Sequence, residues 1–243
     1  MTLLLLAGTG LAQDIARRLD DRKTDVIVSL AGGSRTAAAA GGHEVRIGGF
    51  GGDAGFCAYL AERGVSAVLD ATHPFAARIS DRSARICAEL GLPYALAQRP
   101  PWVPQAGDLW QMVEREEEAA RHIAPGSTVF LATGRQTLER FANLGACQLI
   151  CRQIDPPDRA FPFENGRFLV GTPPFSVTQE RELFAELKVD WLVVKNAGGA
   201  ASATKLTAAR ELGVQVAMIE RPALPDAPVM RSAEEALDWV AVL

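Results

Sequence analysis

The sequence predicts an α/β protein with two domains, each built on a parallel sheet flanked by helices. Short apolar runs alternate with segments of helical periodicity, a pattern typical of parallel sheets that are covered on both faces. The alternation stops at a proline-rich stretch and then restarts, and the predicted strands tend to be followed by glycine, serine, threonine or proline. We therefore expect two Rossmann-like domains, with the active site in the cleft between them.

The first domain is expected over residues 1–98. It opens with a buried strand that runs into a glycine turn, and helices and strands then follow as far as the proline-rich stretch 98–108. The predicted strands are 2–7, 25–31, 43–47, 66–71 and 93–97, and the predicted helices are 11–19, 56–64 and 79–91.

The second domain is expected over residues 99–243. Gly145 and Gly213 are expected to end two of its helices, and a last helix is expected to begin at Ser232, with Glu235 completing a capping box. The predicted strands are 127–134, 147–154, 190–196 and 214–222, and the predicted helices before the last are 135–145, 178–188 and 202–213.

Composition excludes several classes of function. The chain has 243 residues, 48% of them hydrophobic, and a net charge of −4, which gives no general attraction to nucleic acid or to an anionic membrane. Its apolar runs are shorter than the roughly 18 residues of a membrane span, and its opening lacks the basic start of a signal peptide, so we expect a cytoplasmic protein. The four cysteines lack zinc spacing and are expected to be buried thiols, so no metal is expected.

The first predicted strand ends in a turn that fits a nucleotide phosphate. Gly8, Thr9 and Gly10 stand between this strand and a helix, where backbone amides and the helix N-terminus can hold an anion. The dinucleotide fingerprint is incomplete, because Gln13 occupies the position of the third glycine. A glycine turn without any nucleotide is the alternative.

The end of the second strand favours NADPH over NADH. It carries Ser29, Ser34 and Arg35, where NAD enzymes usually hold an acid against the ribose hydroxyls. Hydroxyl and guanidinium groups suit a 2′-phosphate, and a solvated loop arginine is the competing interpretation. The third strand leads into Gly49, Phe50 and Gly51, where the backbone could approach a flat ligand, unless this segment is a flexible linker.

The run "VLDATHPFA" places polar side chains at the end of a buried strand. Asp70 and Thr72 are candidate cofactor contacts, and Asp70 could instead hold the turn through backbone hydrogen bonds. His73 could donate a proton near neutral pH, and a histidine that caps backbone groups in a turn is the alternative.

Three loops of the second domain carry basic residues or glycines at strand ends. Such loops can bind anions, and three of them at three strand ends favour one shared site over three solvated caps. The candidate residues are Thr133, Gly134, Arg135, Lys195, Asn196, Gly198 and Lys205.

A set of motifs runs nearly the whole length of the chain: "LAGTG", "GGFGG", "DATHPFA", "RPPW", "FLATGRQ", "PPF" with a following Glu180, "KNAGG", "TKLTAAR" and "ERP". Through them the sequence closely resembles the precorrin-6A/cobalt-precorrin-6A reductase family of cobalamin biosynthesis. The motifs "DATHPFA" and "KNAGG…TKL" are specific, whereas the opening glycine turn alone is not.

The resemblance implies an enzyme that uses NADPH to reduce one double bond of the macrocycle precorrin-6A, giving precorrin-6B, without metal or flavin. With it, the segment from Asp70 to Phe75 is expected to face the nicotinamide, and Phe75 or Thr72 to line the hydride path. Basic loops in the second domain would hold the carboxylates of the tetrapyrrole. His73 and Lys195 are the candidate proton donors, and the Ser34–Arg35 turn favours NADPH and the metal-free substrate over the NADH-dependent cobalt form.

Rival classes share parts of this pattern. A non-catalytic nucleotide sensor or a two-domain small-ligand binding protein would also have paired α/β domains. A short-chain dehydrogenase needs a Tyr and a Lys four residues apart, but Tyr59 is followed by Arg63 and Tyr94 by Gln98. The oligomeric state is not determined by the sequence, which is compatible with a monomer.

Overall fold

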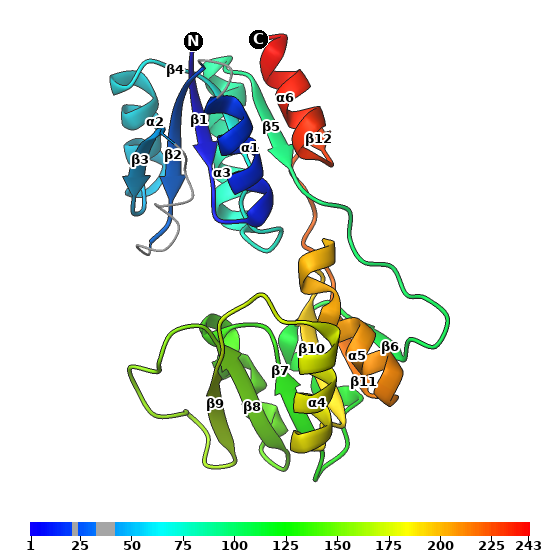
Figure 1. Ribbon diagram of the computed structural model, residues 1–243. Coiled ribbons are helices and arrows are strands. Elements are labelled where there is room, and N and C mark those ends of the chain that lie inside the picture. Colours follow the sequence, from blue (N-terminus) through cyan, green and yellow to red (C-terminus); the bar gives the residue numbers. More distant parts are fainter. Residues whose placement is uncertain (21–23, 33–41) are drawn as a thin grey trace. The chain divides into compact units, whose positions relative to one another are not determined.

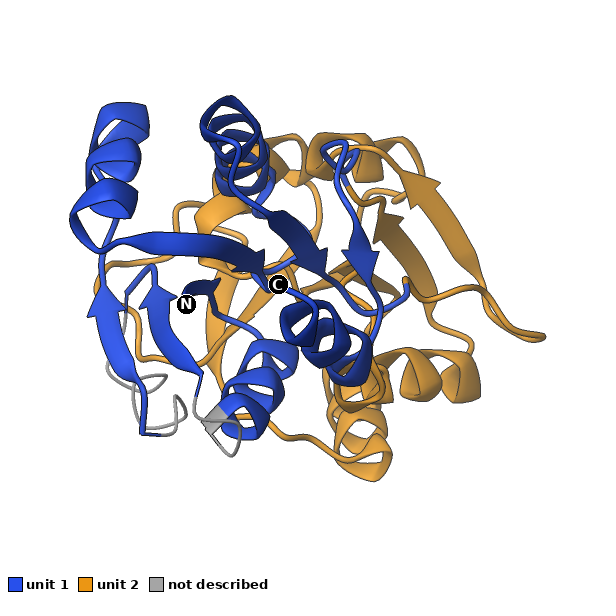
Figure 2. Cartoon of the chain, turned by 90° about the horizontal axis from the view of Figure 1, so that it is seen from above, with its two compact units in different colours: residues 1–100, 222–243 blue, residues 101–221 orange. Residues whose placement is uncertain are grey.

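The computed structural model describes residues 1–20, 24–32 and 42–243, which form two compact units (Figure 1). Unit 1 comprises Met1–Pro100 and Pro222–Leu243, and unit 2 comprises Pro101–Arg221; Figure 2 distinguishes them by colour. Each unit contains a six-stranded parallel sheet with helices packed against it. The predicted class of two Rossmann-like sheets is therefore confirmed.

Unit 1 has the strand order of a dinucleotide-binding sheet. Its elements are β1 (Thr2–Leu6), α1 (Gly10–Asp20), β2 (Asp25–Leu30), β3 (Glu44–Ile47), α2 (Gly52–Glu62), β4 (Val65–Asp70), α3 (Ala77–Leu90), β5 (Tyr94–Ala97), β12 (Val229–Met230) and α6 (Ala233–Ala241). The strands lie in the order β3-β2-β1-β4-β5-β12, and all neighbours are parallel. The order reverses between β1 and β4, and such sheets bind ligands beside the carboxyl ends of the strands at this reversal.

Apolar side chains cover both faces of the unit 1 sheet. Leu3 and Leu5 of β1 belong to one buried cluster with residues of α1 and α6, whereas Leu4 packs with Phe56 of α2 and Ile86 of α3. Because successive strand residues point to opposite faces, the run of leucines fills both layers. Each fully buried leucine stabilises the fold by about 1.5–3 kcal/mol.

Unit 2 repeats this arrangement. Its elements are β6 (Trp110–Val113), η2 (Glu116–Arg121), β7 (Thr128–Leu131), η3 (Arg135–Leu144), β8 (Gln148–Gln153), β9 (Gly166–Val170), α4 (Val177–Leu187), β10 (Trp191–Lys195), η4 (Ala200–Ser202), α5 (Thr204–Leu212) and β11 (Gln215–Ile219). The order is β9-β8-β7-β10-β11-β6, again all parallel, with the reversal between β7 and β10. Helices α4 and α5 contact each other and share a buried cluster with Phe130 and Leu192.

The division of the chain differs from the expected domains at the C-terminus. Residues 222–243 were assigned to the second domain, but they belong to unit 1. Val229 of β12 pairs with Leu96 of β5, and Ala236 and Leu237 of α6 join the cluster beneath α1. Sequence patterns could not reveal this, because a two-residue strand carries almost no periodicity and its partner is more than a hundred residues away.

Three local expectations are also corrected. Residues 135–144 form a 3₁₀ helix, and Gly145, which follows it, has φ −59°, so it is not a left-handed cap, whereas Gly213 is one, with φ 68°. Strands β6 and β9 were not predicted. The capping box at Ser232 is half formed: its hydroxyl accepts a bond from the Glu235 N–H, but the Glu235 carboxylate accepts from the N–H of Arg231. None of the described helices combines the length and apolar character needed to cross a bilayer.

Candidate functional site

The glycine turn after β1 is tied to the end of β4, at the reversal of the unit 1 sheet. The buried Thr9 hydroxyl donates to the carbonyl of Ala71 at 2.8 Å and accepts from the N–H of Ala12 at 3.1 Å. Thr9 thereby caps α1, while Gly8 has φ 141°, a conformation that an L-residue rarely adopts. The turn with Gly10 places the first backbone N–H groups of α1 at the reversal, where an anion would be bound.

An arginine that sequence reasoning missed lies beside the end of β2. Arg46 of β3 approaches the buried Ser29 hydroxyl at 3.5 Å, and it donates to the carbonyls of Gly48 and Gly49. Its guanidinium lies 3.7 Å from the centre of the Phe50 ring. The predicted residues Ser34 and Arg35 lie outside the described residues, so Arg46 is the guanidinium that the structure places at this strand end.

The glycine-rich turn before α2 is shaped by close backbone packing. Gly51 precedes the helix with φ 78°, and a Cβ on Gly55 would come within 1.8 Å of the Phe50 carbonyl oxygen. The Phe50 ring packs edge-on against Phe56, with 4.8 Å between ring centres. The turn is thus part of the packed unit and is not a linker.

Asp70 holds the turn after β4. One carboxylate oxygen accepts from the N–H of Thr72 at 2.9 Å and from its hydroxyl at 2.6 Å, and the other accepts from the Tyr94 hydroxyl at 3.0 Å. Asp70 is only 1% exposed. Burial, and then the neighbouring Asp70 charge, raise the pKa of the Tyr94 hydroxyl far above its ordinary value. This arrangement fits the turn-holding alternative for Asp70.

His73 is exposed and its ring also organises the turn. Its Nδ1 accepts a bond from the N–H of Phe75 at 3.2 Å, and the two rings lie 5.7 Å apart. An accepting Nδ1 places the proton of the neutral ring on Nε2. In its neutral form His73 is therefore a hydrogen-bond donor through Nε2.

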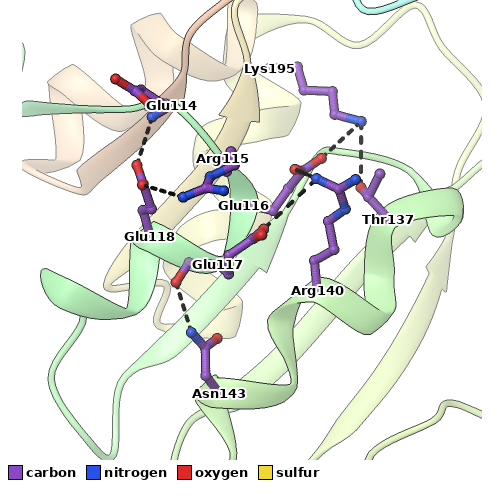
Figure 3. Close-up of polar contacts among 9 residues, drawn as sticks. All are labelled: Glu114, Arg115, Glu116, Glu117, Glu118, Thr137, Arg140, Asn143 and Lys195. Atoms are coloured by element: carbon purple, nitrogen blue, oxygen red, sulfur yellow. Dashed lines mark hydrogen bonds and ion pairs between the residues drawn. The ribbon is translucent and has the colours of Figure 1, made fainter.

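In unit 2, Lys195 lies at the carboxyl end of β10 within a cluster of charges (Figure 3). Its ammonium lies 3.3 Å from one oxygen of Glu116 and 3.5 Å from the Thr137 hydroxyl, while Arg140 lies 3.2 Å from the other oxygen of Glu116. Burial alone raises the pKa of the Glu116 carboxyl, but its own backbone N–H and the charge of Lys195 outweigh burial, so this pKa lies below its usual value. Glu116 is therefore a carboxylate that holds the lysine in place.

Asn196 has a structural role beside Lys195. Its side-chain oxygen accepts from the N–H of Trp102 at 2.8 Å, and its amide donates to the carbonyl of Trp102 at 3.0 Å. The indole of Trp102 donates to the carbonyl of Gly199 at 3.0 Å, and Gly198 and Gly199 both have positive φ. These bonds fix the "KNAGG" loop against the segment that enters unit 2.

The loop after β7 contributes an unpaired hydroxyl and a solvated ion pair. The buried Thr133 hydroxyl has no hydrogen-bond partner among the described residues. The next residue, Gly134, has φ 78°. Arg135 lies 3.0 Å from Asp158, and the two side chains are 47% and 71% exposed. An exposed pair of this kind contributes little to stability and leaves Arg135 accessible to a ligand.

A pocket of about 180 Å³ opens beside the carboxyl ends of β7, β8 and β9. Arg152 and Glu180 form a bidentate pair in its wall, with N–O distances of 2.7 and 2.8 Å. Lys205, at the start of α5, donates to the carbonyl of Ser202 at 2.6 Å. The residues that line it are Ala132, Arg152, Gln153, Ile154, Gly171, Pro173, Phe175, Glu180, Ala201, Ser202, Thr204 and Lys205. Sequence reasoning found Lys205 but assigned no role to Arg152 or Gln153.

The described residues contain no group of three or more His, Cys, Asp or Glu side chains placed to hold a metal. The four cysteines are unpaired thiols; Cys57 is partly buried and the other three are buried. Burial raises the pKa of Cys87 to about 12 and that of Cys151 to about 11, so neither is a ready nucleophile.

Known proteins match this chain over nearly its whole length. The family model described as "Precorrin-6x reductase CbiJ/CobK" matches residues 2–241. A precorrin-6A reductase of Rhodobacter capsulatus is 40% identical over 242 residues, covering 98% of this chain and 95% of its own, and one of Rhodococcus erythropolis is 40% identical over 244 residues, covering 99% and 98%. A cobalt-precorrin-6A reductase of Priestia megaterium is 32% identical and covers 73% of each chain. A solved structure, "CobK precorrin-6A reductase", superposes with a TM-score of 0.93 at 38% identity, covering all of this chain and 97% of the other.

Proposed function

Since the chain belongs to the precorrin-6x reductase CbiJ/CobK family, we propose that it uses NADPH to reduce one double bond of precorrin-6A, giving precorrin-6B, in cobalamin biosynthesis. The observation that carries this proposal is the end-to-end likeness to precorrin-6A reductases, at 40% identity and with a TM-score of 0.93 to a solved member. Unit 1 is the proposed cofactor-binding unit and unit 2 the proposed substrate-binding unit.

The residues of unit 1 fit a phosphorylated dinucleotide. The sheet has the order of dinucleotide-binding folds, and the glycine turn places the N-terminus of α1 at its reversal. Beside the end of β2, Arg46 and Ser29 offer a guanidinium and a hydroxyl, and the segment from Val26 to Gly32 contains no acid that would repel a 2′-phosphate. This supports NADPH as the cofactor. The role of Ser34 and Arg35 in binding the 2′-phosphate remains a prediction.

NADPH would supply the hydride when bound. Reduction of a conjugated carbon also requires a proton, and the chain offers Lys195 and His73 for this step. We favour Lys195, because its ammonium carries transferable protons and is held by Glu116, whereas His73 would have to give up the bond between Nδ1 and the Phe75 N–H to become an imidazolium. His73 would then orient substrate or cofactor through Nε2–H.

The function is tested by mixing the purified protein with precorrin-6A and following the absorbance of NADPH. We expect one NADPH to be consumed for each macrocycle reduced, with NADH far less effective. If NADPH stays unconsumed in the presence of precorrin-6A, the chain is a binding protein and the proposal is wrong.

The cobalt-containing substrate is the second candidate, and the comparisons favour it less. Cobalt-precorrin-6A reductases are 26–32% identical to this chain, whereas the precorrin-6A reductases are 37–40% identical over nearly all of it. Assaying both substrates side by side decides between them, and a higher kcat/KM for the cobalt form would reverse our assignment.

A single-turnover assay separates the roles of the two candidate acids. Lys195→Met should slow reduction by about 100-fold or more and change the pH profile, because a positioned acid typically contributes about 100- to 10,000-fold. His73→Gln, which keeps a side-chain N–H donor, should slow reduction by less than about tenfold. The reverse ranking would assign the proton to His73.

A further inference from the structure

Two guanidinium groups in unit 1 lie over the ring of Phe50, and no acid among the described residues pairs with either of them. The guanidinium carbon of Arg46, on β3, is 3.7 Å from the centre of the ring, and that of Arg82, on α3, is 6.0 Å from it. Both distances are measured to the same ring, so the two charges lie in one small region beside the Phe50 turn.

Arg82 is the less satisfied of the two. Its side chain is partly buried, and its Nε is a buried atom without a hydrogen-bond partner in the described parts of the chain. Its printed neighbours are rings: besides Phe50, the fully buried Phe56 has its ring centre 5.4 Å from the guanidinium carbon. A buried donor without an acceptor is costly and uncommon in folded proteins. This indicates that a ligand supplies the acceptor.

Two neighbouring arginines, in contrast, have acid partners. Arg85, three residues further along α3, pairs with Asp53 of α2, and Arg63, at the end of α2, pairs with Glu44. Both pairs hold the charge of an arginine close to that of a carboxylate. The two arginines that contact Phe50 therefore differ from these neighbours, because each carries a charge that no described acid balances.

Phe50 is a fixed support for both unpaired groups. Its ring packs edge-on against Phe56 and Tyr59, with 4.8 and 5.3 Å between ring centres. The Arg46 guanidinium carbon also lies 5.0 Å from the centre of the Tyr59 ring. A guanidinium that stacks on a ring keeps the N–H donors at its edge available for an oxyanion. The two cations are thus held in place before a ligand binds, which lowers the entropy lost on binding.

A phosphate monoester fits this pair of charges. It carries a charge of about −1.5 to −2 at pH 7, and its oxygens accept parallel bonds from arginine. Arg46 also approaches the Ser29 hydroxyl at the end of β2, where dinucleotide-binding folds hold the adenosine ribose. The 2′-phosphate of NADPH is the monoester that the proposed function brings to this ribose.

We propose that Arg82 is a second determinant of the preference for NADPH, and that it binds the 2′-phosphate together with Arg46. The inference rests on the proposed function for the identity of the cofactor. It gives a role to an arginine that no sequence motif indicated.

The test uses two probes that differ only in the 2′-phosphate, adenosine 2′,5′-bisphosphate and adenosine 5′-monophosphate, titrated into the full chain by calorimetry. Arg82→Met should weaken binding of the bisphosphate about tenfold, because charge-assisted bonds are lost, and should leave the Kd of the monophosphate within twofold of the parent. Arg82→Gln should give the same result.

Arg85→Met is the matched control. It removes the same charge from the same helix, but at an exposed arginine that already has an acid partner. Both Kd values should stay within twofold of the parent. The double variant Arg46→Met/Arg82→Met should lose more of the preference for the bisphosphate than Arg46→Met alone, because each arginine contributes its own bonds.

Unchanged binding of the bisphosphate in Arg82→Met and Arg82→Gln, with their folding verified by circular dichroism, would overturn the proposal. Equal losses for both probes would overturn it as well, since Arg82 would then support the fold alone. The probes carry no nicotinamide, so this test is independent of catalysis. If the parent reduces precorrin-6A with NADPH but the variants keep the preference, the site is wrong and the function stands. If the parent consumes no NADPH but the variants lose the preference, the function is wrong and the site stands.

Discussion

The two units share one strand order but use different chemistry at the carboxyl ends of their strands. In unit 1 the guanidinium at these ends, that of Arg46, donates to backbone carbonyls and not to an acid. The carboxylate there, that of Asp70, pairs with the neutral donors Thr72 and Tyr94. In unit 2 the acids pair with cations, as Glu180 does with Arg152 and Glu116 with Lys195. The fold determines where a ligand binds, and the side chains placed there determine which ligand it is.

This contrast separates the two proposed ligands. Backbone amides at a helix N-terminus suit the phosphates of a dinucleotide, whereas separate cations suit carboxylates at several points of a larger molecule. It also predicts that removing a charge at a strand end should destabilise unit 2 more than unit 1. The variants below test this difference, beginning with the largest effect.

Glu180→Gln should be the most damaging change. It leaves Arg152 as a buried, uncompensated charge, and removing one partner of a buried pair costs about 3–5 kcal/mol. Hydrogen exchange should show reduced protection in unit 2 and unchanged protection in unit 1. Glu182→Gln, at an exposed acid on the same helix, is the control and should have no measurable effect. If Glu180→Gln lowers the free energy of unfolding by less than about 1 kcal/mol, the Arg152–Glu180 pair is not needed for unit 2 to fold.

Lys205→Met should stabilise the unliganded protein at pH 7. The pKa of Lys205 falls from 10.5 to about 8 in the folded state, so folding disfavours its charged form by at most about 3 kcal/mol. In the parent, the unfolded state binds more protons between pH 8 and 10.5, so stability should rise with pH across this window. The variant should lack this rise, as urea unfolding at several pH values would reveal. Lys188→Met should retain it, and a destabilised Lys205→Met would contradict the argument.

Asp70→Asn should destabilise unit 1 by about 1.5–2 kcal/mol. The amide loses the charge that strengthens the bonds from Thr72 and Tyr94, and bonds to charged groups contribute about 1.5–3 kcal/mol. The loss should be nearly independent of salt, because the donors are neutral. Asp81→Asn, at an exposed site on α3, is the matched control. A strong dependence on salt would place a cation near Asp70 and weaken the contrast between the units.

Arg46→Met should have the smallest effect, confined to the cofactor. We expect about a tenfold weaker affinity for NADPH, or about 1.4 kcal/mol, and less than twofold for NADH, since only NADPH carries the 2′-phosphate. Titration of each cofactor provides the measurement, with the exposed Arg17→Met as control. Equal losses for both cofactors would mean that Arg46 supports the Phe50 turn alone.

The fold was largely predictable from sequence because its signals are local. The leucine run of β1 is apolar on both faces, as in a strand covered by helices on both sides, and Gly91 and Gly213 end their helices in the left-handed conformation. Strand β12 was missed because it is recognisable only by its pairing with β5. The segment from Arg135 was predicted as a helix, but neither its 3₁₀ form nor its contact with η2 was predicted.

The sequence predicted where the residues of the candidate sites lie better than it predicted what each residue does. Strand ends such as Asp70 and Lys195 were identified, since parallel sheets gather functional residues there. That Asp70 accepts from Tyr94, that Glu116 holds Lys195 and that Asn196 pairs with the backbone of Trp102 depended on contacts between distant segments. Gln153 gave no signal, because a glutamine at a strand end is ordinary until its lack of a partner is seen.

Because the chain returns to unit 1 at its C-terminal end, the two units are completed in a fixed order during synthesis. The ribosome delivers residues 101–221 before residues 222–243, so unit 2 has all its strands while unit 1 still lacks β12 and α6. Until then β5 is an open edge, and the side of α1 that α6 will cover exposes apolar surface around Leu19. The nascent chain is thus expected to finish unit 2, the proposed substrate-binding unit, first. A chain stopped before residue 222 should carry a complete unit 2 beside an aggregation-prone unit 1.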